Sequence, residues 1–121
     1  MNKLLSQLRR IRKELKSRFS GFPNNCCTGT VIELNERLGL PIQAGYLYNI
    51  KHAWNTTIDE KYIIDLTASQ CTCNPDIQII PIGESIKRGY VIVPEARDAV
   101  LSLQEGIRQE KRLDMLLVYN N

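Results

Sequence analysis

No run of apolar residues in this sequence approaches the roughly 20 residues that a membrane-spanning helix requires. The beginning of the chain also lacks the apolar core of a secretory signal, because Leu4 and Leu5 are soon followed by Arg9 and Arg10. There is no internal repeat, no low-complexity segment and no linker long enough to divide domains. These absences predict a cytoplasmic protein with a single domain over residues 1–121.

The composition is that of a globular protein. Hydrophobic residues make up 43% of the chain and charged residues 24%, a balance that excludes an intrinsically disordered protein. A chain of this length buries about two-thirds of its unfolded surface in one core. Neither a disulfide nor a metal is needed merely to hold such a fold together, and we expect no cofactor.

The positive charge is concentrated near the beginning of the chain. Residues 1–20 carry seven basic side chains and one acidic side chain, a net charge of +6, whereas the whole chain carries +3. A segment of this kind is either a solvated helix face or a docking surface for nucleic acid, anionic lipid or an acidic partner. Among these partners we expect an acidic one and no nucleic acid.

Three segments have the apolar spacing of helices. Residues 1–20 are predicted to contain a basic amphipathic helix, because apolar side chains recur every three or four residues: Leu4, Leu8, Ile11, Leu15 and Phe19. A second helix is predicted from about Cys26 to Leu38, where Gly39 supplies a C-terminal signal. Residues 94–121 are predicted to form a C-terminal helix and tail that starts at Pro94 and is weakened at Gly106.

Between the second and third helices the pattern changes to that of strands. Residues with high β-propensity are concentrated in five runs: 44–50, 52–58, 62–66, 77–82 and 90–93. Two helices, a meander of strands and a final helix are typical of an α+β fold. We therefore expect the second helix to pack centrally on an antiparallel sheet, within a core of residues 22–93, and the other two helices to flank it.

Three residues of this core have the chemistry of a nucleophile, a base and an orienting acid. Cys27 lies at the predicted start of a helix, where the positive end of the helix dipole stabilises a thiolate. His52, the single histidine, lies on a predicted strand and can face that thiolate. Asp65, on the adjacent strand, can accept a hydrogen bond from the other ring nitrogen. Backbone N–H groups at the helix start would supply part of an oxyanion hole.

The predicted hairpin brings the last two of these residues together. Asp59, Glu60 and Lys61 have the composition of a turn between the two strands. If the chain turns near residues 58–59, antiparallel pairing places His52 directly beside Asp65.

A longer pattern surrounds the three residues: Cys27, Leu38-Gly39-Leu40-Pro41, Gly45-Tyr46, His52-Ala53-Trp54 and Tyr62-Ile63-Ile64-Asp65-Leu66-Thr67. This pattern, within residues 22–70, resembles the core of the transglutaminase-like and papain-like cysteine enzymes. In that superfamily the cysteine opens a central helix, and the histidine and aspartate lie on successive antiparallel strands. The resemblance implies Cys–His–Asp catalysis of acyl transfer on a protein or peptide: peptide or isopeptide hydrolysis, amide transfer, or glutamine deamidation.

The nucleophile position has two candidates. Counting four, seven and eleven residues on from Cys27 gives an apolar face: Val31, Leu34 and Leu38. The same count from Cys26 gives a solvated face: Thr30, Glu33 and Arg37. Because the apolar face should pack on the sheet, we choose Cys27 as the nucleophile and keep Cys26 as the alternative.

Three more residues are candidates for lining the site: Asn25, Trp54 and Gln70. Each also has a structural interpretation. Asn25 fits helix capping or a turn, Trp54 fits packing that shields the Cys–His pair, and Gln70 fits a surface loop.

Two further functions stay open. A catalytically inactive relative would keep the fold and bind a partner protein through its basic helix. A zinc-binding module would use all four cysteines: Cys26, Cys27, Cys71 and Cys73. Structural zinc sites favour about two to four residues between paired ligands, whereas these pairs have none and one, so we expect no metal. The oligomeric state does not follow from the sequence.

Overall fold

The computed structural model describes residues 2–23, 26–70 and 77–119 of the chain. In these ranges the chain forms three α-helices, each at a predicted place: α1 (Asn2–Arg18), α2 (Cys27–Leu38) and α3 (Pro94–Tyr119). Two single-turn 3₁₀ helices, Ala68–Gln70 and Ile82–Glu84, lie among the strands. No helix among the described residues is long and apolar enough to cross a membrane.

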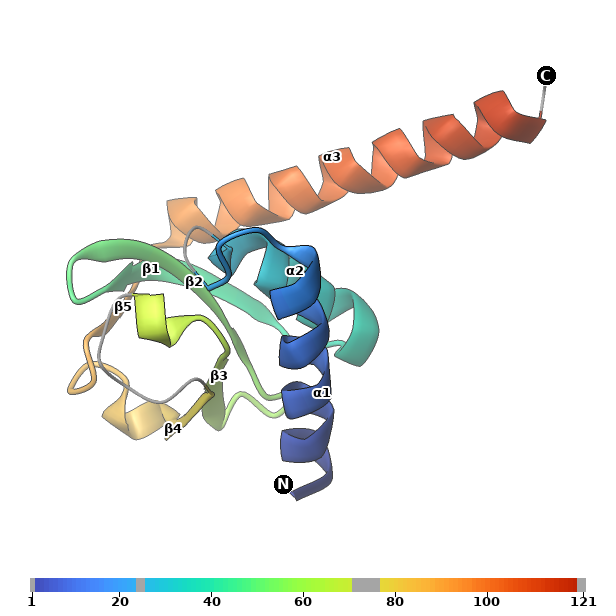
Figure 1. Ribbon diagram of the computed structural model, residues 1–121. Helices are drawn as coiled ribbons and strands as arrows, with labels where there is room; N and C mark the ends of the chain where they lie inside the picture. Colours follow the sequence, from blue (N-terminus) through green and yellow to red (C-terminus); the bar gives the residue numbers. More distant parts are fainter. Residues whose placement is uncertain (1, 24–25, 71–76, 120–121) are drawn as a thin grey trace.

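Five strands form one antiparallel sheet. Their bounds are β1 (Ile42–Leu47), β2 (Ile50–Thr56), β3 (Tyr62–Asp65), β4 (Gln78–Pro81) and β5 (Tyr90–Ile92). The order across the sheet is β4-β3-β2-β1-β5. The first four strands form a meander as predicted, but the fifth departs from it, because β5 pairs with β1 at the opposite edge and not with β4. The sheet is curled, with α2 and α3 along one side of it (Figure 1). This arrangement of helices and antiparallel strands is the α+β class that the sequence predicts.

The first hairpin turns earlier than predicted. The predicted strand continued to Ile50, but the chain turns at Tyr48 and Asn49, whose φ angles are 48° and 65°. Two consecutive residues with positive φ form a tight turn whose twist matches that of an antiparallel hairpin. Leu47 therefore pairs with Ile50, and β2 begins before the predicted strand.

The second hairpin has a different register from the predicted one. The Cα partners between β2 and β3 are Asn55 with Ile64 and Thr56 with Ile63. His52 is therefore not directly opposite Asp65, as predicted, but lies diagonally from it. The observed register differs from the predicted one by two positions. Because side chains alternate between the two faces of a sheet, His52 and Asp65 still lie on the same face.

The turn of this hairpin explains the shifted register. The carboxylate of Asp59 accepts a hydrogen bond from the Thr57 hydroxyl (2.6 Å) and another from the Lys61 N–H (3.1 Å). Glu60 adopts a positive φ of 59°. These contacts stabilise a longer turn, centred later in the chain than residues 58–59.

Helix α2 packs centrally on the sheet, and α1 and α3 flank it, each with its own contacts to the strands. One buried cluster joins α2 to β1, β2 and α3: Val31, Ile32, Ala44, Ala53 and Val100. A second cluster joins α1 to α2 and to β3 and the residue that follows it: Leu8, Ile11, Leu15, Leu34, Ile64 and Leu66. The apolar stripe predicted for the first helix is thus turned toward the core.

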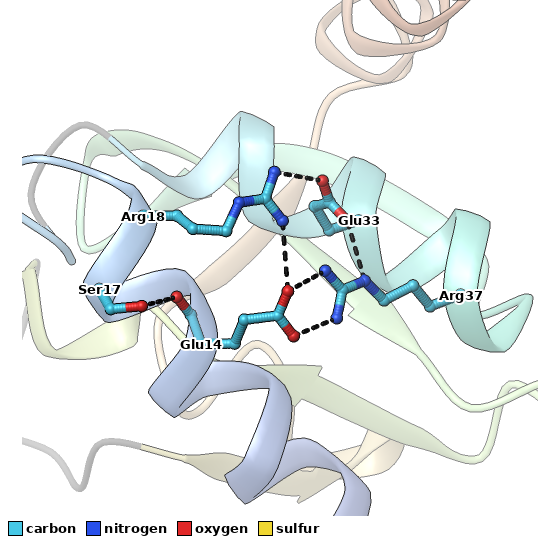
Figure 2. Close-up of polar contacts among 5 residues, drawn as sticks. All are labelled: Glu14, Ser17, Arg18, Glu33 and Arg37. Carbon is cyan, nitrogen blue, oxygen red and sulfur yellow. Dashed lines mark hydrogen bonds and ion pairs between the residues drawn. The ribbon is translucent and has the colours of Figure 1, made fainter.

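Charged side chains join the solvent-facing sides of α1 and α2 (Figure 2). The Glu14 carboxylate accepts two hydrogen bonds from the Arg37 guanidinium, at 2.6 and 2.7 Å. Arg18 contacts both Glu14 (3.5 Å) and Glu33 (3.4 Å), and Arg37 also contacts Glu33 (3.0 Å). The hydrogen bond from Arg37 lowers the pKa of Glu14 from 4.5 to about 2.

Helix α3 is longer than the sequence pattern suggested. The pattern predicted a helix through Ile107 with a weak point at Gly106, but the helix continues to Tyr119. A single glycine costs a helix about 1 kcal/mol relative to alanine, which is too little to end it. The second half of α3 extends past the sheet (Figure 1).

Candidate active site

A buried amide links α2 to the sheet, in addition to the apolar cluster between them. The side-chain N–H groups of Asn55, on β2, donate to the carbonyl oxygens of Val31 (3.1 Å) and Leu40 (3.3 Å). Val31 lies one helical turn after Cys27, and Asn55 lies three residues after His52. This contact therefore aligns the first turn of α2 with the part of β2 that carries His52.

Cys27 is the first residue of α2 and is half-buried. Its sulfur lies 4.0 Å from the Thr28 hydroxyl, and His52 and Ala53 line the same pocket, where the imidazole and the Ala53 N–H act on the charge of the thiol. Burial acts to raise the pKa of Cys27, but the hydrogen bond and charge of His52, together with the Ala53 N–H, outweigh burial and lower the pKa below its usual value of 9.0. The surroundings of Cys27 therefore make its thiolate easier to form than that of an ordinary thiol.

The neighbouring Cys26 has different surroundings. It occupies the N-cap position of α2, and its sulfur lies 3.9 Å from the carbonyl oxygen of Ser20. Burial, and then the proximity of Cys27, raise the pKa of the Cys26 thiol. The prediction that Cys26 lies on a solvated face was wrong, because this residue packs partly against the cluster between α1 and α2. The structure brings Cys27, and not Cys26, to the histidine.

His52 lies on β2 and is buried, with 3% of its surface exposed. Its Nε2 atom is 2.7 Å from Oδ2 of Asp65. Burial acts to lower the pKa of the ring, but hydrogen bonds with Asp65 and Cys27, and the charges of both, raise it from 6.5 to about 9. The imidazole therefore favours its protonated form beside the thiolate.

Asp65 ends β3 and is also buried, with 1% of its surface exposed. Its Oδ1 atom accepts hydrogen bonds from the N–H (3.0 Å) and the hydroxyl (3.4 Å) of Thr67. Its Oδ2 atom accepts a hydrogen bond from the Tyr90 hydroxyl at 2.8 Å as well as contacting His52. Both oxygens of this buried carboxylate are therefore satisfied, as a buried charge requires.

Tyr90 is a site residue that sequence reasoning missed. The sequence pattern predicts only a strand at Tyr90, and nothing in the order of residues ties β5 to Asp65. The available signal was chemical, because a tyrosine in a buried strand needs an acceptor for its hydroxyl. Trp54 supports the same group from behind: its ring lies 4.9 Å from that of Tyr90, edge to face, and 6.2 Å from that of His52.

A pocket of about 280 Å³ opens beside Cys27 and His52. One wall comes from β1 and β2, and the other from α3 and the residue before it: Val93, Ala96, Ala99 and Val100. Two hydrogen bonds hold α3 in place, from Arg97 Nε to the carbonyl oxygen of Ile42 (2.9 Å) and from Gln104 to Asn35 (2.8 Å). Sequence reasoning missed this contribution of the last helix, because it depends on a contact between distant parts of the chain.

Gly45 is required where β1 passes the site. It pairs with His52 on one side and with Ile92 of β5 on the other. A Cβ atom at this position would collide with the carbonyl oxygen of Val91. Only glycine therefore lets β5 approach β1 closely enough to carry Tyr90 to Asp65.

The three candidate lining residues have different outcomes. Trp54 is buried behind the histidine and does not line the pocket at Cys27. Gln70 ends a short 3₁₀ helix, and its side chain lies outside the described part of the structure. Asn25 lies outside the described residues, as do Cys71 and Cys73. Within the ranges that the structure does describe, no group of three or more histidine, cysteine or acidic side chains is placed to hold a metal ion.

Comparisons with known proteins add no relative on which to base a function. No protein-family model, curated protein or solved structure matches this chain. What the protein does is therefore inferred from the Cys27–His52–Asp65 group and the pocket beside it.

Proposed function

We propose that this protein is a cysteine-dependent acyl-transfer enzyme that acts on an amide of a peptide or protein. Cys27 is the nucleophile, His52 moves the proton and Asp65 orients His52. The observation that carries the proposal is that one buried imidazole lies 2.7 Å from the Asp65 carboxylate and lines the same pocket as the Cys27 thiol, whose pKa it lowers. The same observation supports a papain-like or transglutaminase-like core, with the cysteine opening α2 and the other two residues on neighbouring strands.

In the first half of the reaction the Cys27 thiolate attacks the carbonyl carbon of the amide. A carbon–sulfur bond forms, and the electron pair of the carbonyl π bond moves to its oxygen. When this intermediate collapses, the carbon–nitrogen bond breaks and protonated His52 gives its proton to the leaving nitrogen. The products are a free amine or ammonia and a thioester on Cys27.

In the second half water or an acceptor amine attacks the thioester. Neutral His52 removes the proton from the attacking group, and Asp65 stabilises the imidazolium that forms. The carbon–sulfur bond then breaks, and its electron pair returns to Cys27 as thiolate. Water gives hydrolysis or deamidation, whereas an amine gives amide transfer.

The start of α2 supports the charge changes in both halves. Among the described residues, no acidic side chain lies in its first turn and no side chain caps its N-terminus. The free backbone N–H groups and the positive end of the helix dipole are therefore available to a thiolate or an oxyanion.

The alternative functions make different demands on the two early cysteines. A shared zinc ion requires both thiols to converge on one point, but Cys26 contacts Ser20 whereas Cys27 contacts His52. A purely binding relative has no need for a low thiol pKa or for the ordered His52–Asp65 contact. The observed contacts therefore favour acyl transfer.

The proposal is tested by thiol alkylation at about pH 6 and by acetylation with p-nitrophenyl acetate, with mass spectrometry to locate each adduct. Both reagents should modify Cys27 on the order of tenfold or more faster than an ordinary thiol, because the ion pair supplies thiolate well below the usual thiol pKa. Cys26→Ala is the matched control and should keep this reactivity, whereas His52→Ala should lose it. Labelling that falls mainly on another cysteine, or that survives His52→Ala, would contradict the proposed triad.

A further inference from the structure

A second recess, of about 700 Å³, lies between α1 and the edge strand β4. Its apolar floor consists of Leu5 on α1 and Ile77 and Ile79 at β4. Its charged wall consists of four basic side chains of α1: Arg9, Arg12, Lys13 and Lys16. Positions three and four residues apart lie on one face of a helix, so the wall is continuous. We call this recess the basic groove.

The charges of the basic groove are not neutralised by α1 itself. Glu14 is the single acidic residue of this helix, and it is turned toward α2, where Arg37 binds it (Figure 2). Arg9, Lys13 and Lys16 are exposed and form no ion pair with an acidic residue of the described ranges. Among the described residues, α1 therefore has one charged face that is held by ion pairs with α2 and another on which Arg9, Lys13 and Lys16 meet no acidic side chain.

Nearby acidic residues of the sheet also face elsewhere. Asp59, at the turn between β2 and β3, lines a different recess together with Leu4 and Arg37. Asp65 is buried and bound to His52. Neither carboxylate lines the basic groove, so no acidic side chain of the described residues stands between Arg9, Lys13 and Lys16 and a ligand from outside.

We propose that the basic groove docks an acidic segment of another polypeptide, whose carboxylates contact Arg9, Lys13 and Lys16 and whose aliphatic side chains lie on Leu5, Ile77 and Ile79. Charge complementarity selects the sign of the partner and speeds its association. The apolar floor selects a chain that carries aliphatic side chains between its charges.

The composition of the groove and the packing of α1 argue against other polyanions. No aromatic side chain of the described residues lines the groove, so bases of a single-stranded nucleic acid find no surface on which to stack. A helix that lies on a membrane inserts its apolar face, but in α1 that face is buried in the core at Leu8, Ile11 and Leu15. An acidic polypeptide is the partner that uses both the floor and the wall.

This inference does not depend on the proposed catalysis. The basic groove shares no residue with the pocket at Cys27. If the chain failed to bind an acidic peptide but kept its Cys27 reactivity, only the docking proposal would be refuted. If it bound the peptide but Cys27 reacted like an ordinary thiol, only the catalytic proposal would be refuted.

The test measures binding of a fluorescein-labelled peptide of alternating glutamate and valine to the full chain by fluorescence anisotropy. The groove variant is Arg9→Glu with Lys13→Glu. Its matched control is Lys3→Glu with Arg10→Glu, which makes the same change of charge at exposed positions of α1 outside the groove. We expect the groove variant to bind about tenfold more weakly, the control variant to bind within about twofold of the original chain, and added salt to weaken binding.

Two further peptides and two competitors complete the test. Replacing valine by serine, or glutamate by glutamine, should each weaken binding, because one removes the contact with the floor and the other the contact with the wall. Equal loss in the two protein variants, no binding of the glutamate–valine peptide, or undiminished binding of the glutamate–serine peptide would overturn the proposal. The proposal would also be overturned if oligothymidylate or phosphatidylserine vesicles bound more tightly than the glutamate–valine peptide and the groove variant lost this binding. The groove would then be a site for that polyanion. Circular dichroism verifies that both variants are folded.

Discussion

The hydroxyl of Tyr90 donates a 2.8 Å hydrogen bond to Oδ2 of Asp65, the same oxygen that lies 2.7 Å from His52. Two strands separate β5 from β3 in the order of the sheet, so this contact exists only because the sheet curls. Tyr90 therefore links the closing of the sheet to the orientation of the proposed triad.

Replacing Tyr90 by Phe should raise the pKa of His52 further. The carboxylate of Asp65 loses one donor, so its negative charge acts more fully on the imidazolium. Because the chain has a single histidine, NMR titration of the ring reports this pKa directly. The variant should also lose about 1–3 kcal/mol of unfolding free energy, the usual cost of a lost buried hydrogen bond. Tyr48→Phe, at an exposed position, is the control, and an equal effect there would argue against the link.

Replacing Asp65 by Asn should lower the pKa of His52 and slow alkylation of Cys27 at about pH 6. The neutral amide no longer stabilises the imidazolium, so the thiolate beside it is less populated. Asp98→Asn makes the same chemical change at an exposed position of α3 and should leave both measurements unchanged. A normal alkylation rate in Asp65→Asn would mean that the acid has only a structural role.

The protein should become less stable as the pH falls below about 6.5, because the stability that the thiolate–imidazolium pair contributes is then lost. The lowered pKa of Cys27 contributes stability that is lost as pH falls through the folded pKa, and the raised pKa of His52 contributes stability that is lost as pH rises through about 9. Below about 9 and above the lowered pKa of Cys27, the folded pair holds one proton, on the imidazole; the unfolded chain also holds one, on the thiol, down to about 6.5, so the two slopes cancel there. Below 6.5 the unfolded chain binds an additional proton.

Urea unfolding of the protein and of Cys27→Ala at several pH values between about 5 and 9 tests this proton count. The original chain should have nearly constant stability above about 6.5 and lower stability at pH 5, whereas Cys27→Ala should not show the loss at pH 5. The same decline in both proteins would show that other groups cause it.

Replacing Gly45 by Ala should destabilise the protein by about 1–3 kcal/mol, because the added Cβ atom would meet the Val91 carbonyl oxygen and push β5 away from β1. Gly106→Ala is the matched control: its Cβ meets nothing within 4 Å, and it should stabilise α3 by about 0.5–1 kcal/mol. Thermal unfolding separates the two cases. If Gly45→Ala proved neutral, the close approach of the two strands would not be required.

The sequence predicted the elements well because their signals are local. The apolar stripe of α1, the glycine after α2 and the β-branched runs each act over a few residues. The registers were harder, since they depend on which residues of a turn adopt positive φ and on side-chain contacts such as those of Asp59. The contacts of Asp59 in the turn shifted the pairing of β2 and β3 from the predicted register.

The candidate site divides in the same way. Cys27, His52 and Asp65 could be proposed because their chemistry and their places on adjacent elements are visible in the sequence. Tyr90 and the wall of Ala96 and Ala99 could not, because they reach the site through the curl of the sheet and the packing of α3. Those features arise from contacts between distant segments, which residue spacing does not encode.

The length of α3 has a practical consequence for attaching labels or fusion partners. Tyr119 lies about 28 Å along the helix from Val100, at a rise of about 1.5 Å per residue, so a tag at the C-terminal end stands well clear of the cysteine pocket. A tag at the other end would sit within two turns of Leu5 and crowd the basic groove. Immobilisation through the end of α3 therefore leaves both surfaces accessible in the same assay.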